Sequence, residues 1–300
     1  MQKNIQKVGG QAVLEGVMMR AGDHVAVAVR NPDGEICLQK EAISSWGSRW
    51  PFLRWPIIRG AAGMVESLKI GTKALHFSAV TLGEEEEEES ADWVGKLVMG
   101  VGFLLALGLF VALPSVITRF LAPVGFASWQ MSALEGGIKL VIFFGYLWSI
   151  SRLKDIRRVF EYHGAEHKTI YAYENGVELT PEKVRPFTRL HPRCGTNFLF
   201  LVVIVSIILS TFVTWSSLGE RIFVRILLLP VVAGLAYELI RLGGSSQNWF
   251  IRLIMFPGLM LQNLTTREPD DSQLEVAIAA LEGALANQKE VEESQLPLIS

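Results

Sequence analysis

Four long apolar segments limit what this chain can fold into. They cover residues 94–113, 134–150, 198–215 and 222–240, and each has about the length that a helix needs to cross a bilayer core of roughly 30 Å. We expect the first to end at Pro114. A fifth apolar stretch, residues 249–261, is short and broken by Pro257 and Gly258, so we expect it to lie at the membrane interface or to re-enter it. Half of the residues are hydrophobic, which agrees with an α-helical polytopic membrane protein of about four transmembrane helices.

The distribution of Lys and Arg predicts how these spans are oriented. The connection between the second and third spans, residues 151–197, holds nine such residues, whereas the connection between the first and second offers only Arg119. Because basic connections stay in the cytoplasm, we expect a multi-pass protein of the bacterial inner membrane with both termini cytoplasmic. The formal net charge of −2 and the lack of a basic domain argue against a nucleic-acid partner.

The polar segments predict smaller units on either side of the spans. Residues 1–53 read as a β-rich cytoplasmic unit, since residues 24–30 alternate and a turn at residues 31–34 leads into a second strand. Residues 54–82 read as an amphipathic helix that lies on the membrane or on its own domain. Its apolar face is expected to contain Met64, Val65, Leu68 and Leu75. Residues 83–93 read as an acidic linker.

The acidic C-terminal tail, residues 267–300, predicts one more short helix. Ser272 and Glu275 have the spacing of a capping box at its start. Its apolar stripe is formed by Leu274, Ile278, Leu281 and Leu285. We expect this helix to dock on the protein itself or on a protein partner.

A cluster of metal-ligand residues lies in the basic connection. Residues 159–173 read as a helix that ends before Asn175-Gly176, and on it His163 and His167 lie one turn apart on one face. Two imidazoles at this spacing are able to bind one divalent metal ion, for which zinc is the first choice. The order His163-x-x-Glu166-His167 matches the inverted zincin motif, in which the glutamate is the general base. The motif therefore predicts a metal-dependent hydrolase that acts on a lipid or a peptide at the membrane.

A catalytic zinc needs a third protein ligand, and the sequence leaves several candidates open. His191 and Cys194 come just before the third span, at the same expected membrane surface. Glu174 follows the motif on the same helix face. Glu238 is an ionisable group inside the fourth span, which by itself points to function.

Other interpretations of the same residues remain. The histidines can be a structural, salt-bridged helix face, in which case the protein is a non-catalytic membrane scaffold or regulator that binds a partner. Cys194 with His163 or His191 can be a cysteine nucleophile and its base. Glu238, with Lys139 and Arg225, can line a transporter path. Four spans without an internal repeat, however, provide few helices to line such a path.

Four motifs follow one another along the chain: GGQAVLEGVMMR near the start, EYHGAEHKTIYAYE in the middle, LHPRCGTNF before the third span and AYELIR in the fourth. Together they resemble the YqhQ-like family of bacterial membrane proteins, which carries a domain of unknown function. The resemblance extends from about Val8 to about Thr266 and implies a predicted metal-dependent enzyme, without a substrate. Because the motifs are polar and scattered, we expect them to converge on one site. Gln11, Glu15 and Arg20 are then expected to support the metal ligands or to face the substrate.

Overall fold

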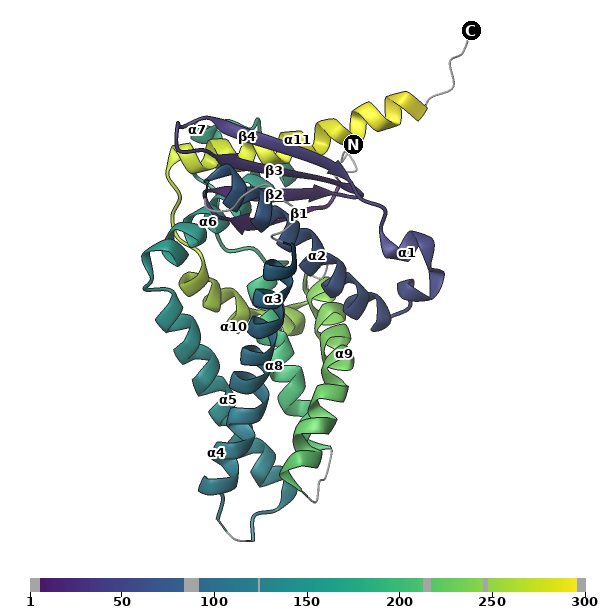
Figure 1. The fold of residues 1–300 in the computed structure, drawn as a ribbon, viewed down its shortest axis with the longest axis vertical. Coiled ribbons are helices and arrows are strands. Elements are labelled where there is room, and N and C mark those ends of the chain that lie inside the picture. Colours follow the sequence, from purple (N-terminus) through teal and green to yellow (C-terminus); the bar gives the residue numbers. More distant parts are fainter. Residues whose placement is uncertain (1–5, 84–91, 124, 213–216, 245–247, 296–300) are drawn as a thin grey trace.

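The computed structural model describes residues 6–83, 92–123, 125–212, 217–244 and 248–295. Figure 1 shows that they form two layers, a bundle of apolar helices below and a polar layer with the β-sheet above. The helices α1 (Trp46–Arg49) and α2 (Ile58–Thr81) lie at the side, where the two layers meet. A short 3-10 helix, η1 (Pro51–Arg54), joins them.

The polar layer is built on a four-stranded antiparallel sheet with the order β1-β2-β3-β4. The strands are β1 (Val8–Val13), β2 (Gly16–Ala21), β3 (His24–Arg30) and β4 (Ile36–Ala42). The β-rich N-terminal unit is therefore confirmed. The stretch before residue 24 adds a hairpin, in which Val13 pairs with Gly16.

Helices cover both faces of this sheet. On β3, Val25, Val27 and Val29 pack against α2, whereas Ala26 and Ala28 face α11 (Asp271–Gln295). The alternation along β3 thus separates large from small side chains rather than buried from exposed ones. Small residues let α11 approach closely, since a Cβ at Gly283 would lie 3.1 Å from the Ala26 Cβ.

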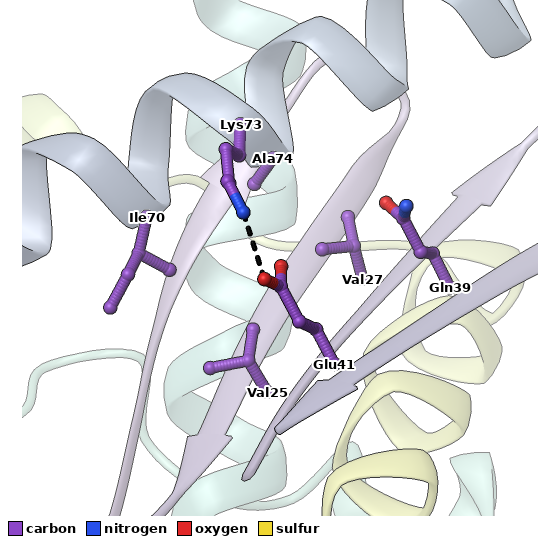
Figure 2. Close-up of a pocket in the computed structure, with 7 residues that line it drawn as sticks. All are labelled: Val25, Val27, Gln39, Glu41, Ile70, Lys73 and Ala74. Atoms are coloured by element: carbon purple, nitrogen blue, oxygen red, sulfur yellow. Dashed lines mark hydrogen bonds and ion pairs between the residues drawn. The ribbon is translucent and has the colours of Figure 1, made fainter. Parts of the chain in front are cut away.

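The face by which α2 packs differs from the expected one. Val65, Leu68 and Leu75 are 46%, 58% and 42% exposed, while Ile70 and Ala74 are buried against the sheet. The face packed on the sheet has Ile70 and small residues, and the expected apolar stripe is left exposed, which agrees with the membrane alternative for this helix. Figure 2 shows the edge of this contact, where Lys73 forms an ion pair with Glu41 at 2.8 Å. The cavity there is about 20 Å³, room for about one water molecule.

The apolar layer contains three described helices that are long and apolar enough to cross a membrane. They are Leu97–Leu121, Ser128–Ile150 and Leu218–Gly243. The third expected span corresponds to α8 (Gly195–Thr211), which has 17 residues; the end of the expected segment, residues 213–215, lies outside the described residues. The protein is thus mostly helical, with three candidate spans in its described part, and the expected count of about four stays a prediction.

Two prolines expected to end or break helices do not. The first span runs as α3 (Asp92–Leu107), a π-helical turn η3 (Gly108–Ala112) and α4 (Leu113–Leu121), so the helix passes Pro114. A π turn just before a proline accommodates the missing N–H and the bulk of the ring. Similarly, α10 (Trp249–Thr265) is continuous and contains Pro257. The remaining bundle helices are α5 (Ser128–Ile150), α8 and α9 (Leu218–Gly243).

The C-terminal helix α11 is longer than the short helix expected in the tail, and it docks on the protein's own sheet. Leu274, Ile278 and Leu281 are buried in the core shared with β2 and β3. Its capping box is formed by Asp270 and Gln273, whose side chains accept each other's backbone N–H at 2.9 Å, and not by Ser272 and Glu275. The acidic run at residues 84–89 lies outside the described residues.

Candidate metal centre

The helix α6 (Lys154–Glu174) carries the His163-x-x-Glu166-His167 motif between the two layers. Asp155 lies in its first turn, where the helix dipole favours a carboxylate, and Gly176 beyond its end has a φ of +68°. The middle of the helix is buried, and His167 is only 1% exposed. The motif is therefore not a solvated helix face.

Three side chains of the motif region converge. One potential ligand atom each of His163, His167 and Cys194 lies within 4.8 Å of the other two. The His163 Nε2 is 3.1 Å from the Cys194 Sγ, and the two imidazole centroids are 4.4 Å apart. Ligands of one zinc ion lie at about 2.0–2.3 Å from it, so the set is slightly wider than a closed site.

Backbone carbonyls fix the tautomer of both histidines. His163 Nδ1 lies 2.8 Å from the Thr265 carbonyl, and His167 Nδ1 lies 2.5 Å from the Arg189 carbonyl. Because a carbonyl oxygen only accepts hydrogen bonds, each Nδ1 carries the proton and each Nε2 keeps its lone pair. This is how proteins commonly orient metal-binding histidines.

Cys194 is positioned by the start of α8. It is the N-cap residue, and its Sγ accepts the backbone N–H of Thr196 at 3.4 Å. The loop before it is held by Gln262 of α10, whose side-chain amide bonds the N–H of His191 at 2.7 Å and the carbonyl of His191 at 2.8 Å. Three separate segments, α6, this loop and the end of α10, therefore set the donor geometry.

Glu166 lies buried beside the cluster. Burial raises the pKa of Glu166 to about 7, although the backbone N–H of Gly10 opposes this shift. β1 approaches α6 closely at this point, since a Cβ at Gly10 would lie 3.0 Å from the Glu166 carboxyl carbon and 2.6 Å from the Met18 carbonyl. Only glycine at position 10 leaves room for this approach.

His191 lies next to the three donors but is oriented differently. Its Nδ1 accepts the backbone N–H of Arg193 at 3.3 Å, so its proton is on Nε2, which faces Glu174 at 3.8 Å. Burial lowers the pKa of His191, with Glu174 opposing the shift. Burial would raise the pKa of Glu174, but hydrogen bonds from His191 and Arg193 outweigh it and lower the value. His191 and Glu174 thus bind each other rather than join the donor set.

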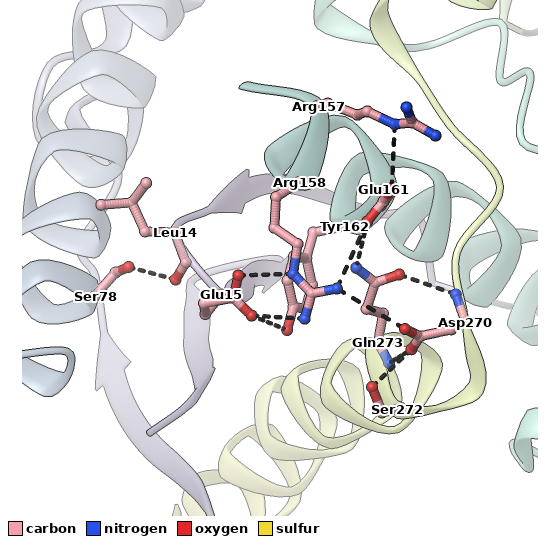
Figure 3. Close-up of polar contacts among 10 residues, drawn as sticks. All are labelled: Leu14, Glu15, Ser78, Arg157, Arg158, Glu161, Tyr162, Asp270, Ser272 and Gln273. Atoms are coloured by element: carbon pink, nitrogen blue, oxygen red, sulfur yellow. Dashed lines mark hydrogen bonds and ion pairs between the residues drawn. The ribbon is translucent and has the colours of Figure 1, made fainter. Parts of the chain in front are cut away.

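The other predicted site residues lie in separate contacts. Glu15 pairs with Arg158 at 2.7 and 2.8 Å and accepts the Tyr162 hydroxyl at 3.0 Å, one residue from His163 (Figure 3). Gln11 and Arg20 instead contact α2, at Gly71 and Glu66. Glu15 thus contacts the helix that carries the two histidines, whereas Gln11 and Arg20 contact α2, and the role of all three at a metal site stays a prediction.

Glu238 is not near the cluster's ligand set. Its carboxylate binds Arg59 and accepts the backbone N–H of Ile57 at 3.4 Å, at the start of α2. Ile57 has a φ of +70°. A Cβ added at Gly234 would lie only 2.4 Å from the Ile57 carbonyl oxygen, so the two backbones are in close contact. The carboxylate in the fourth span thus anchors a tight junction between α2 and α9.

Sequence reasoning missed a second buried polar cluster inside the bundle. Glu135 of α5 is 1% exposed; it accepts the Ser115 hydroxyl at 2.8 Å and pairs with Arg221 at 2.8 Å and with Arg225. One turn along α5, Lys139 donates to Ser206 at 2.7 Å. The spacing of Glu135 and Lys139 by four residues was the available signal, since it puts both on one helix face.

Comparisons with known proteins identify the relatives of the chain. The family described as "Protein of unknown function (DUF1385)" matches residues 55–287. The chain is 35% identical over 303 residues to a Bacillus subtilis (strain 168) protein described as "Uncharacterized protein YqhQ", which covers 96% of this chain and 95% of that protein. No solved structure matches.

Proposed function

The chain belongs to the DUF1385 family, and from this premise we propose that it is a multi-pass membrane protein with a metal-dependent, hydrolase-type site at the cytoplasmic membrane surface. His163, His167 and Cys194 bind the metal, and zinc suits a set of two nitrogens and one sulfur. The observation that carries this proposal is the pair of carbonyl-bound imidazoles, whose free Nε2 atoms flank one buried sulfur.

The roles of the residues follow from their surroundings. A zinc ion bound there supplies Lewis-acid chemistry and, with three protein ligands, keeps a position for a substrate. Glu166 is the proton-transfer group, because it is the buried carboxyl nearest in sequence to both histidines. Glu15 keeps α6 on the sheet through Arg158 and Tyr162, so it supports the ligands without touching them.

The orientation of the protein in the membrane is part of the proposal. Nine Lys and Arg residues in the connection at residues 151–197 support a cytoplasmic location of α6 and of the whole polar layer. With the site at the top of the apolar bundle, a substrate with a membrane anchor reaches it without leaving the bilayer.

Elemental analysis of the full chain, purified in detergent, tests the proposal. We expect stoichiometric zinc in the unmutated protein and its loss in the H163A, H167A and C194A variants. The matched control is H191Q, which should retain zinc because His191 is committed to Glu174 and the Arg193 N–H. Zinc at background level in the unmutated protein would refute the proposal. Zinc lost equally from H191Q would show that the ligand set is wrong.

A metal site can also be structural, as in a non-catalytic scaffold, and E166Q separates the two cases. If the site is catalytic, E166Q retains zinc but fails to complement a deletion of the gene. If it is structural, E166Q both retains zinc and complements.

A cysteine nucleophile is the second candidate, favoured by the 3.1 Å contact between His163 Nε2 and Cys194 Sγ. The orientation of His163 by the Thr265 carbonyl suits a general base as well as a metal ligand. This candidate predicts that C194A abolishes complementation while H167A does not, and that the purified protein carries no zinc.

A further inference from the structure

A large groove lies beside the metal cluster, at the junction of the two layers. It has a volume of about 920 Å³, in the range of pockets that bind small molecules. Its walls come from the α1–η1 segment, α2, the start of α8 and the end of α9. Arg193 and Gly195, the two residues that flank Cys194 in the chain, both line it. The groove therefore passes beside the backbone of Cys194, whose own side chain is buried and is not part of the lining.

The lining of the groove is rich in guanidinium groups. It contains Arg20, Arg54, Arg59, Arg193 and Arg241, against the two carboxylates of Asp23 and Glu66. Glu238 and Glu174, which do not line the groove, hold Arg59 and Arg193. The five arginines exceed these four carboxylates by one positive charge, which matches a singly charged phosphodiester.

The guanidinium groups remain able to bind a phosphate. A guanidinium has five N–H donors in a planar fork, and a bidentate carboxylate uses only two of them. Arg54 donates to the carbonyl of Gly47 at 2.6 Å, a partner that does not neutralise its charge. Arg54 is also exposed, so its guanidinium is accessible to an incoming anion.

Apolar side chains continue the groove toward the membrane. Trp46, Leu53, Met64 and Phe198 line it together with the arginines. Beside it, Trp50, Phe52 and Trp55 are 53%, 48% and 63% exposed. Tryptophan interleaved with arginine is typical of the headgroup region of a bilayer. In Figure 1 this segment lies beside the upper end of α9, level with the top of the apolar bundle.

We propose that this groove binds the phosphodiester headgroup of an anionic phospholipid and presents it to the Cys194 side of the metal cluster. The binding of the headgroup is argued from the groove alone. The presentation of the headgroup to the cluster rests on the proposed metal-dependent function. A soluble phosphate compound shares the headgroup chemistry, but it would not use the exposed aromatic residues of the α1–η1 segment.

Titration of the full chain in detergent with fluorescent phosphatidylglycerol, against phosphatidylcholine of the same acyl chains, tests the binding half. We expect tighter binding of phosphatidylglycerol, and a loss of about tenfold in R54Q, the effect of one charge-assisted hydrogen bond. R49Q is the matched control, because Arg49 is in the same segment but does not line the groove. S67E, which adds a negative charge to the groove wall, should weaken binding as well and serves if R54Q does not fold.

The other outcomes overturn the proposal. Equal affinity for the two lipids, or equal losses in R54Q and R49Q, would remove the groove as a headgroup site. Competition by inorganic phosphate or glycerol phosphate as strong as by the lipid would assign the groove to a soluble phosphate compound instead.

A variant without the metal ligands keeps this test separate from that of the proposed function. H163A/H167A should bind phosphatidylglycerol as the unmutated protein does. Lipid binding without zinc in the unmutated protein would therefore refute only the metal site, and zinc without lipid selectivity would refute only the groove.

Discussion

Replacing Gly164 by alanine should destabilise the polar layer, although alanine is the better helix former. Gly164 lies between His163 and Glu166 on α6, where the chain after α10 crosses the helix. A Cβ at this position would lie 2.0 Å from the Arg267 carbonyl oxygen and 3.3 Å from Pro269. Since such contacts are rarely shorter than 3.0 Å, the crossing segment must move by about 1 Å.

The size of the effect follows from three contributions. Helix propensity favours alanine by about 1 kcal/mol. Overpacking against a backbone group costs about 1–3 kcal/mol, and the displacement weakens the Arg267 N–H to Phe160 carbonyl bond, measured at 2.8 Å and worth about 1 kcal/mol. The net result is a loss of about 1–3 kcal/mol. The same movement carries Thr265, the acceptor of His163 Nδ1–H, so zinc affinity should fall as well.

Thermal unfolding in detergent, with zinc content measured on the same samples, checks this prediction. The control is G63A on α2, where nothing lies within 4 Å of the added methyl group, so that only the propensity gain remains. We expect G164A to unfold at a lower temperature than the unmutated protein, and G63A at the same or a higher one. If G164A were as stable as G63A, the close approach of the Arg267 carbonyl to Gly164 would be refuted. The orientation of His163 by the neighbouring Thr265 carbonyl would then be refuted as well.

Three other contacts give measurable expectations. Glu135→Ala should destabilise the protein by about 3–5 kcal/mol in detergent unfolding, because it leaves two buried arginines without their carboxylate; a change below about 1 kcal/mol would contradict the buried pairing. Glu15→Gly should be less destabilising than Glu15→Ala by about 1 kcal/mol, since both lose the ion pair but only glycine accepts the φ of +46° without strain. Burial would raise the pKa of Asp270, but hydrogen bonds to its carboxylate outweigh burial and lower it. The ionised carboxylate therefore stabilises the fold at pH values above the unfolded-state pKa of about 3.9. This stabilisation is lost as the pH falls through the lower folded-state pKa. Asp270→Asn keeps the helix cap but should flatten the acid end of the stability profile, and an unchanged profile would refute this role.

The sequence predicted the elements better than their contacts. Apolar length identified the bundle helices, and alternation identified the strands, because both depend on local periodicity. Alternation on β3 could not indicate that helices cover both faces, since valine and alanine are both apolar. The packed face of α2 was also missed, because glycine and alanine contacts bury little surface and leave a weak pattern.

The candidate site was only partly predictable for a related reason. The helix spacing placed His163 and His167 together, and Cys194 was among the open candidates for a third donor. The choice between Cys194 and His191 depends on backbone groups, namely which histidine nitrogen meets a carbonyl and which meets an N–H. Backbone groups are the same for every residue type, so no sequence pattern records them. Glu238 was a candidate third ligand but binds Arg59 instead. A charged residue in a span indicates that it has a partner, but the sequence does not show which residue that partner is.

The arrangement of the cluster bears on whether a bound metal would serve catalysis or only stability. A structural zinc site is closed by four protein ligands, whereas a catalytic one keeps three and leaves one position open. Among the residues that the structure describes, three donors converge, and the nearest further imidazole, His191, turns its Nε2 toward Glu174. Glu166 is buried beside them, and in the described part of the chain it forms no ion pair that would explain the cost of its burial. Three converging donors next to a buried carboxyl support the proposed catalytic site over a closed structural one.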